Sequence, residues 1–213
     1  MKFMYLAKRK PGFTTDQFTC RWRKHGALGM SGGGWKHMLL YTQAEPIRPV
    51  PLAGASGDYD AVAYMVSDSD GFYGDPGPAG LAEAEMMLKD ELETFAGNIP
   101  PLILWVDDKA LKKGPPGGTT AFLFFIDPVI AATVGDHYRK SDAALRIVLN
   151  NVRDDIQIPG VIPLLPYKAV VEVSAVDLPT LKKILESVDP APWRKSDVAV
   201  VTREAVLWDR LPS

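Results

Sequence analysis

The chain has 213 residues, is 46% hydrophobic and carries a formal net charge of −2 at pH 7, which predicts a folded globular protein with a packed core. Charged residues of both signs are interspersed, so no basic stripe predicts a nucleic-acid partner. No apolar run is long enough for a membrane span, and the one at the amino terminus is too short for a signal peptide, so we expect a cytoplasmic protein. The single cysteine, Cys20, excludes an intramolecular disulfide.

The first predicted helix, over residues 14–25, carries the most informative side chain of the chain. Phe18, Trp22 and His25 are spaced i, i+4 and i+7, so helical geometry places them on one face. Gly26 suits a left-handed helix stop, which predicts that His25 lies at the helix end. There the helix dipole favours the imidazolium and burial opposes it, so we expect a pKa near neutrality. A histidine that merely caps the helix is the alternative interpretation.

The predicted elements repeat one order in the two halves of the chain. That order is strand, helix, strand, strand, helix and strand, over residues 2–8, 14–25, 37–46, 59–66, 81–95 and 101–107, and again over residues 120–126, 129–143, 145–153, 167–175, 178–188 and 197–208. The turn-rich run from Lys112 to Gly118 predicts a linker between two modules, residues 1–111 and 119–213. The long segment 68–80 is either a lid or an idle insertion.

The strands show no clean polar alternation, as in the run from Ala121 to Ile126, so we expect both faces of each sheet to be buried. Each half suits a ferredoxin-like sheet with both helices on one face. Packing the two sheets face to face covers the other face. The predicted fold class is therefore α+β, with two ferredoxin-like (βαββαβ) modules that form an intramolecular α+β barrel. Burying about ten large apolar side chains, at ~1.5–3 kcal/mol each, favours this closed form.

The predicted helix 81–95 is amphipathic, with one face expected to lie on the core and the other in solvent. The apolar stripe consists of Leu81, Ala84, Leu88, Leu92 and Phe95, and the solvated residues are Glu83, Glu85, Lys89, Glu91 and Glu93. Asp90 lies at the flank of the stripe, where its side chain reaches either a pocket or solvent. On the first helix we expect Arg21 and Arg23 to be solvated and to stay outside the site.

Several segments of the first half resemble the EthD family in both order and spacing. They are residues 8–18, 22–28, 41–43, 59–61 and 89–95, within residues 2–108. The resemblance implies a barrel of the dimeric α+β type, which a chain of two modules would build by itself. It also implies chemistry similar to that of members assigned to dehydration and decarboxylation of aromatic intermediates, or an accessory role in oxidative degradation. The second half carries no such motif, so we expect it to be mainly a scaffold.

The motifs of common cofactor and metal chemistry do not occur in the sequence. There are three histidines but no His or Cys spacing typical of zinc or non-haem iron, and no glycine-rich nucleotide motif or serine elbow, so we expect no metal and no cofactor. The chemistry is then expected from His25 as the proton-transfer residue, with Tyr41 or His37 stabilising oxyanion charge and Asp90 orienting the imidazole. The expected substrate-binding residues, which would line an apolar pocket, are Tyr5, Trp22, Trp35, His37 and Tyr64.

These residues favour a cofactor-independent lyase, dehydratase or cyclase that acts on a small hydrophobic molecule of aromatic or polyketide-like character. A cofactor-free monooxygenase of a phenolic substrate is the enzymatic alternative, and oxygen dependence separates the two. A non-catalytic accessory or binding protein is the alternative of a different class. A haem protein with His25 or His37 as axial ligand is a further alternative, which a colourless purified protein would dismiss. The sequence leaves open whether the chain forms a homodimer.

Overall fold

The computed structural model describes residues 1–68 and 77–211. The first half contains β1 (Lys2–Ala7), α1 (Thr15–Met30), the 3-10 helix η1 (Gly33–His37), β2 (Met38–Pro46), β3 (Ala61–Ser67), α2 (Gly77–Thr94), η3 (Pro100–Leu102) and β4 (Ile103–Lys112). The second half contains β5 (Gly118–Phe125), α3 (Pro128–Tyr138), β6 (Arg146–Val152), β7 (Ala169–Ala175), α4 (Leu178–Leu185), η4 (Pro192–Lys195) and β8 (Val198–Asp209). The repeated order of strands and helices is therefore present in both halves.

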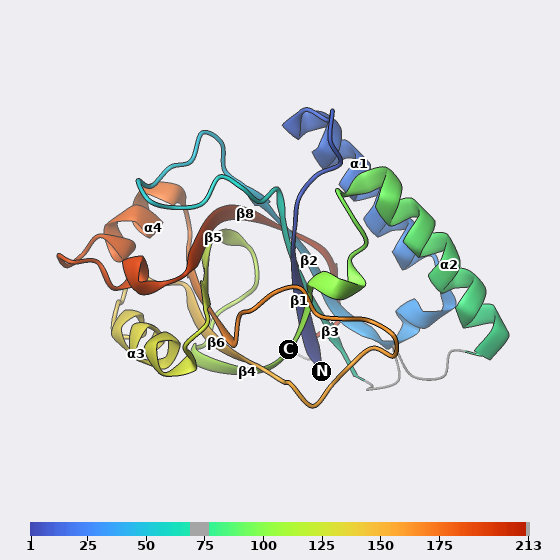
Figure 1. The fold of residues 1–213 in the computed structure, drawn as a ribbon. Helices are drawn as coiled ribbons and strands as arrows, with labels where there is room; N and C mark the ends of the chain where they lie inside the picture. Colours follow the sequence, from blue (N-terminus) through green and yellow to red (C-terminus); the bar gives the residue numbers. More distant parts are fainter. Residues whose placement is uncertain (69–76, 212–213) are drawn as a thin grey trace.

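The strands of the described chain form one closed barrel in the order β1-β3-β2-β8-β5-β7-β6-β4, and β4 pairs back to β1. Each half contributes four neighbouring strands in the same internal order, β4-β1-β3-β2 and β8-β5-β7-β6. The halves meet along two antiparallel seams, β2 with β8 and β4 with β6. Helices α1 and α2 lie on one side of the barrel, and α3 and α4 lie on the opposite side (Figure 1). The predicted fold class, an α+β barrel closed within one chain, is confirmed.

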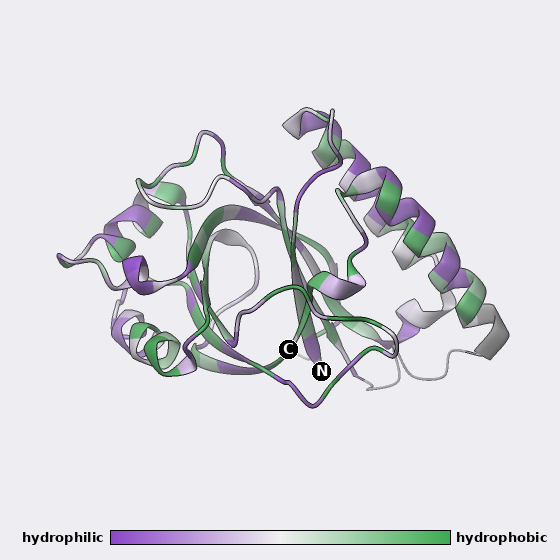
Figure 2. Cartoon of the chain, viewed as in Figure 1, coloured by the Kyte–Doolittle hydropathy of each residue, from purple (hydrophilic) through white to green (hydrophobic). Residues whose placement is uncertain are grey.

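Both faces of most strands are buried, as their composition predicted, while β4 is exposed over residues 107–110. Along β1, Met4 and Leu6 belong to the core inside the barrel, whereas Phe3 and Tyr5 belong to the layer under the helices of the first half. A third apolar cluster packs under α3 and α4. Figure 2 shows hydrophobic residues along most of the barrel strands and mixed character along the helices. The candidate site lies in the layer between the first half's sheet and its helices.

The barrel interior also holds buried charges that come from both halves. The Lys2 Nζ lies 2.6 Å from Glu172 Oε1, and the Arg146 Nη2 lies 3.0 Å from carboxylate oxygens of both Glu172 and Glu204. The Tyr64 hydroxyl donates to Glu204 at 3.2 Å. Because Lys2 and Tyr64 belong to the first half and their partners to the second, these contacts join the two halves. Breaking one such pair leaves a buried charge uncompensated, which is strongly destabilising.

The predicted end of the first helix was wrong. Helix α1 does not stop at Gly26 but continues to Met30. A Cβ atom at position 26 would lie 2.8 Å from Gln43 Nε2 and 3.1 Å from the Tyr41 hydroxyl, both on β2. The glycine therefore allows the helix backbone to approach the sheet closely and has no part in ending the helix. His25 consequently lies within the helix, more than a turn before its end.

The predicted orientation of the second helix was also wrong. The leucines of the expected core stripe are 61% (Leu81), 37% (Leu88) and 52% (Leu92) exposed. Glu91 and Thr94 are buried in their place. Helix α2 packs on α1 through polar contacts of Asp90. Compared with the predicted orientation, the helix is rotated about its axis so that the leucine face points outward. The rotation is about a quarter of a turn, since one residue corresponds to 100°. Residues 69–76 of the predicted lid lie outside the described residues, and residues 77–80 belong to α2.

Candidate active site

Local sequence signals position the start of α1. The Thr14 hydroxyl accepts a hydrogen bond from the Gln17 backbone at 3.2 Å, and the Gln17 side chain accepts one from the Thr14 backbone at 2.9 Å. This capping box satisfies amide groups that the first helical turn would otherwise leave unpaired. One turn later, Phe18 and Trp22 are fully buried and stack with ring centroids 5.6 Å apart. The aromatic face of α1 is thereby held against the sheet, and it carries His25 with it.

His25 is bound by a carboxylate from the neighbouring helix. Its Nδ1 lies 2.7 Å from Asp90 Oδ2, and the other oxygen of Asp90 accepts a hydrogen bond from Arg21. The His25 side chain is only 7% exposed, and the Phe95 ring stands edge-on to the imidazole at 5.3 Å. Because an ionised carboxylate only accepts hydrogen bonds, Nδ1 carries the proton and Nε2 is the basic nitrogen of the neutral ring. The contact with Asp90 therefore fixes the orientation of the imidazole and leaves Nε2 as its unprotonated nitrogen.

Burial and charge set the protonation states of this pair. Burial lowers the pKa of His25 below its ordinary value, although the hydrogen bond and the charge of Asp90 act in the opposite direction. Burial raises the pKa of Asp90, but Arg21 and His25 outweigh it and hold that pKa below the ordinary value. At neutral pH the favoured state is therefore a neutral imidazole beside an ionised carboxylate. This is the state that a general base requires.

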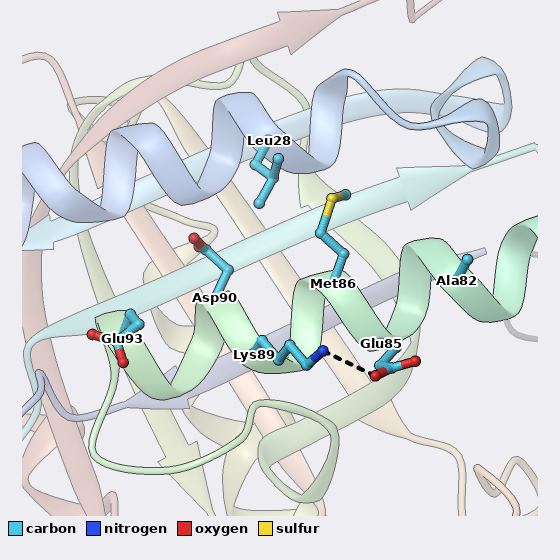
Figure 3. Close-up of a pocket in the computed structure, with 7 residues that line it drawn as sticks. All are labelled: Leu28, Ala82, Glu85, Met86, Lys89, Asp90 and Glu93. Atoms are coloured by element: carbon cyan, nitrogen blue, oxygen red, sulfur yellow. Dashed lines mark ion pairs between the residues drawn. The ribbon is translucent and has the colours of Figure 1, made fainter.

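A groove runs over the outer surface between α1 and α2, and it reaches the Asp90 carboxylate. It has a volume of about 440 Å³ and is lined by Leu28, Ala82, Glu85, Met86, Lys89, Asp90 and Glu93. Figure 3 shows Leu28 pointing from α1 toward α2, with Asp90 and Met86 pointing back. His25 lies beside this groove without lining it. Its volume lies within the range of sites for small molecules.

Two tyrosines and a tryptophan form a hydrogen-bonded row under α1. The Trp22 Nε1 donates to the Tyr5 hydroxyl at 2.8 Å, and Gln43 Nε2 donates to the Tyr41 hydroxyl at 2.6 Å. Burial raises the pKa of Tyr41 to about 12 and that of Tyr5 well above its ordinary value, so both phenols stay protonated. The Tyr41 hydroxyl lies against the backbone of α1 at Gly26. Tyr5 and Trp22 are buried in this layer and do not line the groove between α1 and α2, and Tyr41 is held under the helix.

The structure separates the remaining residues that the sequence suggested. Trp35 is buried beside Tyr41, with ring centroids 5.4 Å apart. His37 is 40% exposed, and its Nδ1 lies 3.2 Å from Asp68 Oδ1. Tyr64 points into the barrel, where it contacts Glu204. The sheet therefore lies between Tyr64 and the imidazole of His25, because neighbouring positions on a strand point to opposite faces.

Two charged residues of this layer were expected in solvent. Arg21 was expected in solvent, yet it binds Asp90. Arg21 precedes His25 by four residues, so the two side chains lie on one helix face, and this spacing was the available signal in the sequence. Glu91 was expected to be solvated, yet it is only 7% exposed and its Oε2 accepts a hydrogen bond from the Ile99 backbone at 2.9 Å. Burial raises the pKa of Glu91 to about 7. The helical pattern did not predict the burial of Glu91, because it assigned the core face of the helix to the leucines, which are exposed.

Neither metal sites nor membrane helices emerge from the described part of the chain. Within residues 1–68 and 77–211, no group of three or more His, Cys, Asp or Glu side chains is arranged to hold a metal ion. None of the described helices combines the length and apolar character of a bilayer-spanning segment. The lone Cys20 is exposed.

Comparisons with known proteins give matches to solved structures at low sequence identity. No family model matches the chain, and no curated protein does either. A candidate monooxygenase from Fusobacterium nucleatum aligns at 11% identity over 97% of this chain and 91% of that one, with a TM-score of 0.48. A candidate monooxygenase from Lactobacillus acidophilus aligns at 9% identity over 98% and 95%, with a TM-score of 0.49. A variant chlorite dismutase from Candidatus Nitrospira defluvii aligns at 10% identity over 96% and 90%, with a TM-score of 0.46.

Proposed function

We propose that this chain is a cofactor-independent acid/base enzyme, of lyase, dehydratase or cyclase type, for a small hydrophobic substrate of aromatic or polyketide-like character. The observation that carries the proposal is the 2.7 Å contact between His25 Nδ1 and Asp90 Oδ2, with Arg21 on the second carboxylate oxygen. In this role His25 Nε2 takes a proton from the substrate and returns it later in the reaction. A positioned general base of this kind supplies roughly 10²–10⁴-fold in rate.

The surroundings of His25 support this assignment of roles. The lowered pKa keeps the imidazole neutral and able to accept a proton at neutral pH. The ionised Asp90 stabilises the imidazolium that forms on proton transfer, and Arg21 keeps Asp90 ionised. The resemblance of residues 8–28 and 89–95 to the EthD family supports the same class of chemistry. Asp90 is then a positioning residue, because it acts on the substrate only through His25.

The groove between α1 and α2 is the proposed entrance for the substrate. Its apolar lining by Leu28 and Met86 suits a hydrophobic molecule, and Asp90 marks its contact with the catalytic layer. Since the His25 ring is 7% exposed, substrate binding has to separate α1 and α2 far enough to expose Nε2. Tyr41 could stabilise developing oxyanion charge only if the same movement uncovers its hydroxyl, which lies under Gly26.

Turnover of phenolic and polyketide-like β-hydroxycarbonyl compounds, followed by mass spectrometry in air and under nitrogen, tests the proposal. We expect turnover under nitrogen, a loss of roughly 10²–10⁴-fold in kcat for His25→Gln, and little change for the matched control His137→Gln in the other half. Near-normal turnover by His25→Gln would overturn the acid/base role. Turnover that requires air would favour a cofactor-free monooxygenase of phenols instead. Binding at the α1–α2 groove without turnover of any compound would favour an accessory protein.

A further inference from the structure

Helix α2 presents an apolar stripe that no described part of the chain covers. Leu81, Leu88 and Leu92 are 61%, 37% and 52% exposed. Together with Glu85 they are spaced 4, 3 and 4 residues apart, which places all four along one face of the helix. An apolar stripe of this kind is uncommon on the surface of a monomer and is typical of a contact with another chain.

The inner face of α2 is already occupied by the fold. Asp90 binds α1, Glu91 binds the Ile99 backbone, and the Thr94 hydroxyl donates to the Asp90 carbonyl within the helix at 2.8 Å. The contacts of Asp90 and Glu91 reach outside the helix and fix its rotation about its axis. The leucines cannot turn inward without breaking the bond between His25 and Asp90. Among the described residues of one copy, the stripe therefore stays uncovered.

Charges beside the stripe indicate what covers it. Glu85 and Lys89 are 70% and 76% exposed and pair with each other at 3.0 Å (Figure 3). An antiparallel pair of α2 helices about a two-fold axis near residues 86 and 87 places Leu81 opposite Leu92 of the second copy. It also places Glu85 of each copy beside Lys89 of the other. The face is thus complementary to itself in both shape and charge, whereas a partner of a single sign would meet an unmatched charge.

We infer that α2 is the surface through which two copies of this chain associate, as an antiparallel helix pair with Leu81, Leu88 and Leu92 at its centre. The inference does not depend on the proposed reaction, because its test measures association of the chain and not turnover. Glu85 and Lys89 of this contact also line the groove between α1 and α2. A helix of 18 residues is about 27 Å long, so the contact is a small one. We therefore expect a dimer that forms in the micromolar range and dissociates on dilution.

Sedimentation velocity over a range of protein concentrations, on the full chain, tests the inference. We expect the wild-type chain to be a dimer at about 100 µM, and Leu92→Glu to raise the dissociation constant at least about tenfold, because each copy places Leu92 at the contact. The matched control is Ile162→Glu, which adds the same charge at a residue that is 79% exposed and lies outside α2. A wild-type chain that stays monomeric at about 100 µM, or a Leu92→Glu variant that dimerises normally, would overturn the inference.

A charge exchange tests the antiparallel register separately. Glu85→Lys and Lys89→Glu each place like charges side by side across the contact, so each variant alone should dimerise more weakly than the wild type. Mixing the two variants restores opposite charges at both positions across the contact, so heterodimers should form in preference to either homodimer. Both variants carry the same repulsion within their own helix, so that effect cannot produce the recovery on mixing. Absence of recovery would overturn the antiparallel pairing.

Discussion

At the scale of single residues, the polar side chains between α1 and α2 set the protonation states of His25 and Asp90. A buried histidine normally loses its proton, and a buried carboxylate normally gains one. Arg21 keeps the Asp90 carboxylate ionised. It does so without touching His25 directly, because it binds the Asp90 oxygen that His25 leaves free. The imidazole is thus neutral and oriented in the resting protein. These protonation states can be measured without knowledge of a substrate.

Asp90→Asn should lower the pKa of His25 further. Asp90 raises that pKa through its hydrogen bond and its charge, and the variant removes the charge. The measurement is a proton NMR titration of the three histidines, with the His25 signal assigned by its loss in His25→Gln. Asp68→Asn is the matched control, since Asp68 contacts only His37 among the histidines of the described chain. A pKa of His25 that stays constant or rises in Asp90→Asn would contradict the described contact.

Glu91→Gln should stabilise the protein at alkaline pH. Because the native pKa of about 7 is higher than the ordinary value of 4.5, the native state binds the proton more tightly than the unfolded chain does. Its stabilising contribution is complete below pH 4.5, declines as the pH rises through 7, and is absent above that. The glutamine stays neutral, so the variant should gain up to about 3 kcal/mol over the wild type by pH 8 and little near pH 4.

Urea unfolding at several pH values measures this difference. Glu93→Gln is the control, because Glu93 lies two positions away and its side chain is 69% exposed. We expect that variant to follow the wild type at every pH. Equal stability of Glu91→Gln and the wild type at pH 8 would show that the Glu91 carboxyl is not held in its neutral form.

At the scale of elements, the close approach of α1 to β2 depends on a single missing side chain. Gly26→Ala adds a Cβ atom 2.8 Å from Gln43 Nε2, so the helix has to move or the glutamine has to leave its hydrogen bonds. Alanine has a better helix propensity by about 1 kcal/mol, but overpacking typically costs about 1–3 kcal/mol, so we expect a net loss of stability. Thermal and urea unfolding measure it.

Gly29→Ala is the matched control for this change on the same helix. The nearest atom to a Cβ at position 29 is Met87 Cε at 3.5 Å, which is an ordinary contact. The higher helix propensity of alanine is then not offset by overpacking, and we expect stabilisation of up to about 1 kcal/mol. If Gly26→Ala were as stable as Gly29→Ala, Gly26 would not be the point of close approach, and its role as a helix stop would have to be reconsidered.

At the scale of the whole molecule, neither half has a complete sheet of its own. Residues 1–112 expressed alone would expose the edges of β2 and β4, the apolar lumen face of the sheet, and the buried Lys2 without Glu172. We expect that fragment to aggregate or to pair with itself, and to become soluble when it is co-expressed with residues 113–213. Size-exclusion chromatography of the fragment and of the mixture measures this. A stable, soluble monomer of residues 1–112 would contradict the mutual dependence of the halves.

The two halves also differ in what lies on their outer faces. In the second half, α3 and α4 cover the sheet with an apolar cluster that includes Leu181, Ile184 and Trp193. In the first half, α2 is attached largely through ionisable and polar contacts, namely Asp90 and Glu91. The assignment of the function to the first half and of a scaffold role to the second half stays a proposal. Helix α2 is also the helix whose Asp90 contacts His25.

The sequence alone determined the strand and helix order, the repeat, the capped start of α1 and the burial of both strand faces. Each of these follows from periodicity, turn residues or the spacing of apolar side chains, which are local properties of the chain. The aromatic face that carries His25 follows from the same periodicity. Only the tertiary structure decided that α1 continues beyond Gly26 and that the leucines of α2 face outward. It also decided that Tyr64 and His37 lie apart from His25. Those outcomes depend on contacts between residues far apart in sequence, such as Asp90 with Arg21 and His25, whose energies outweigh the weaker preference of a local pattern.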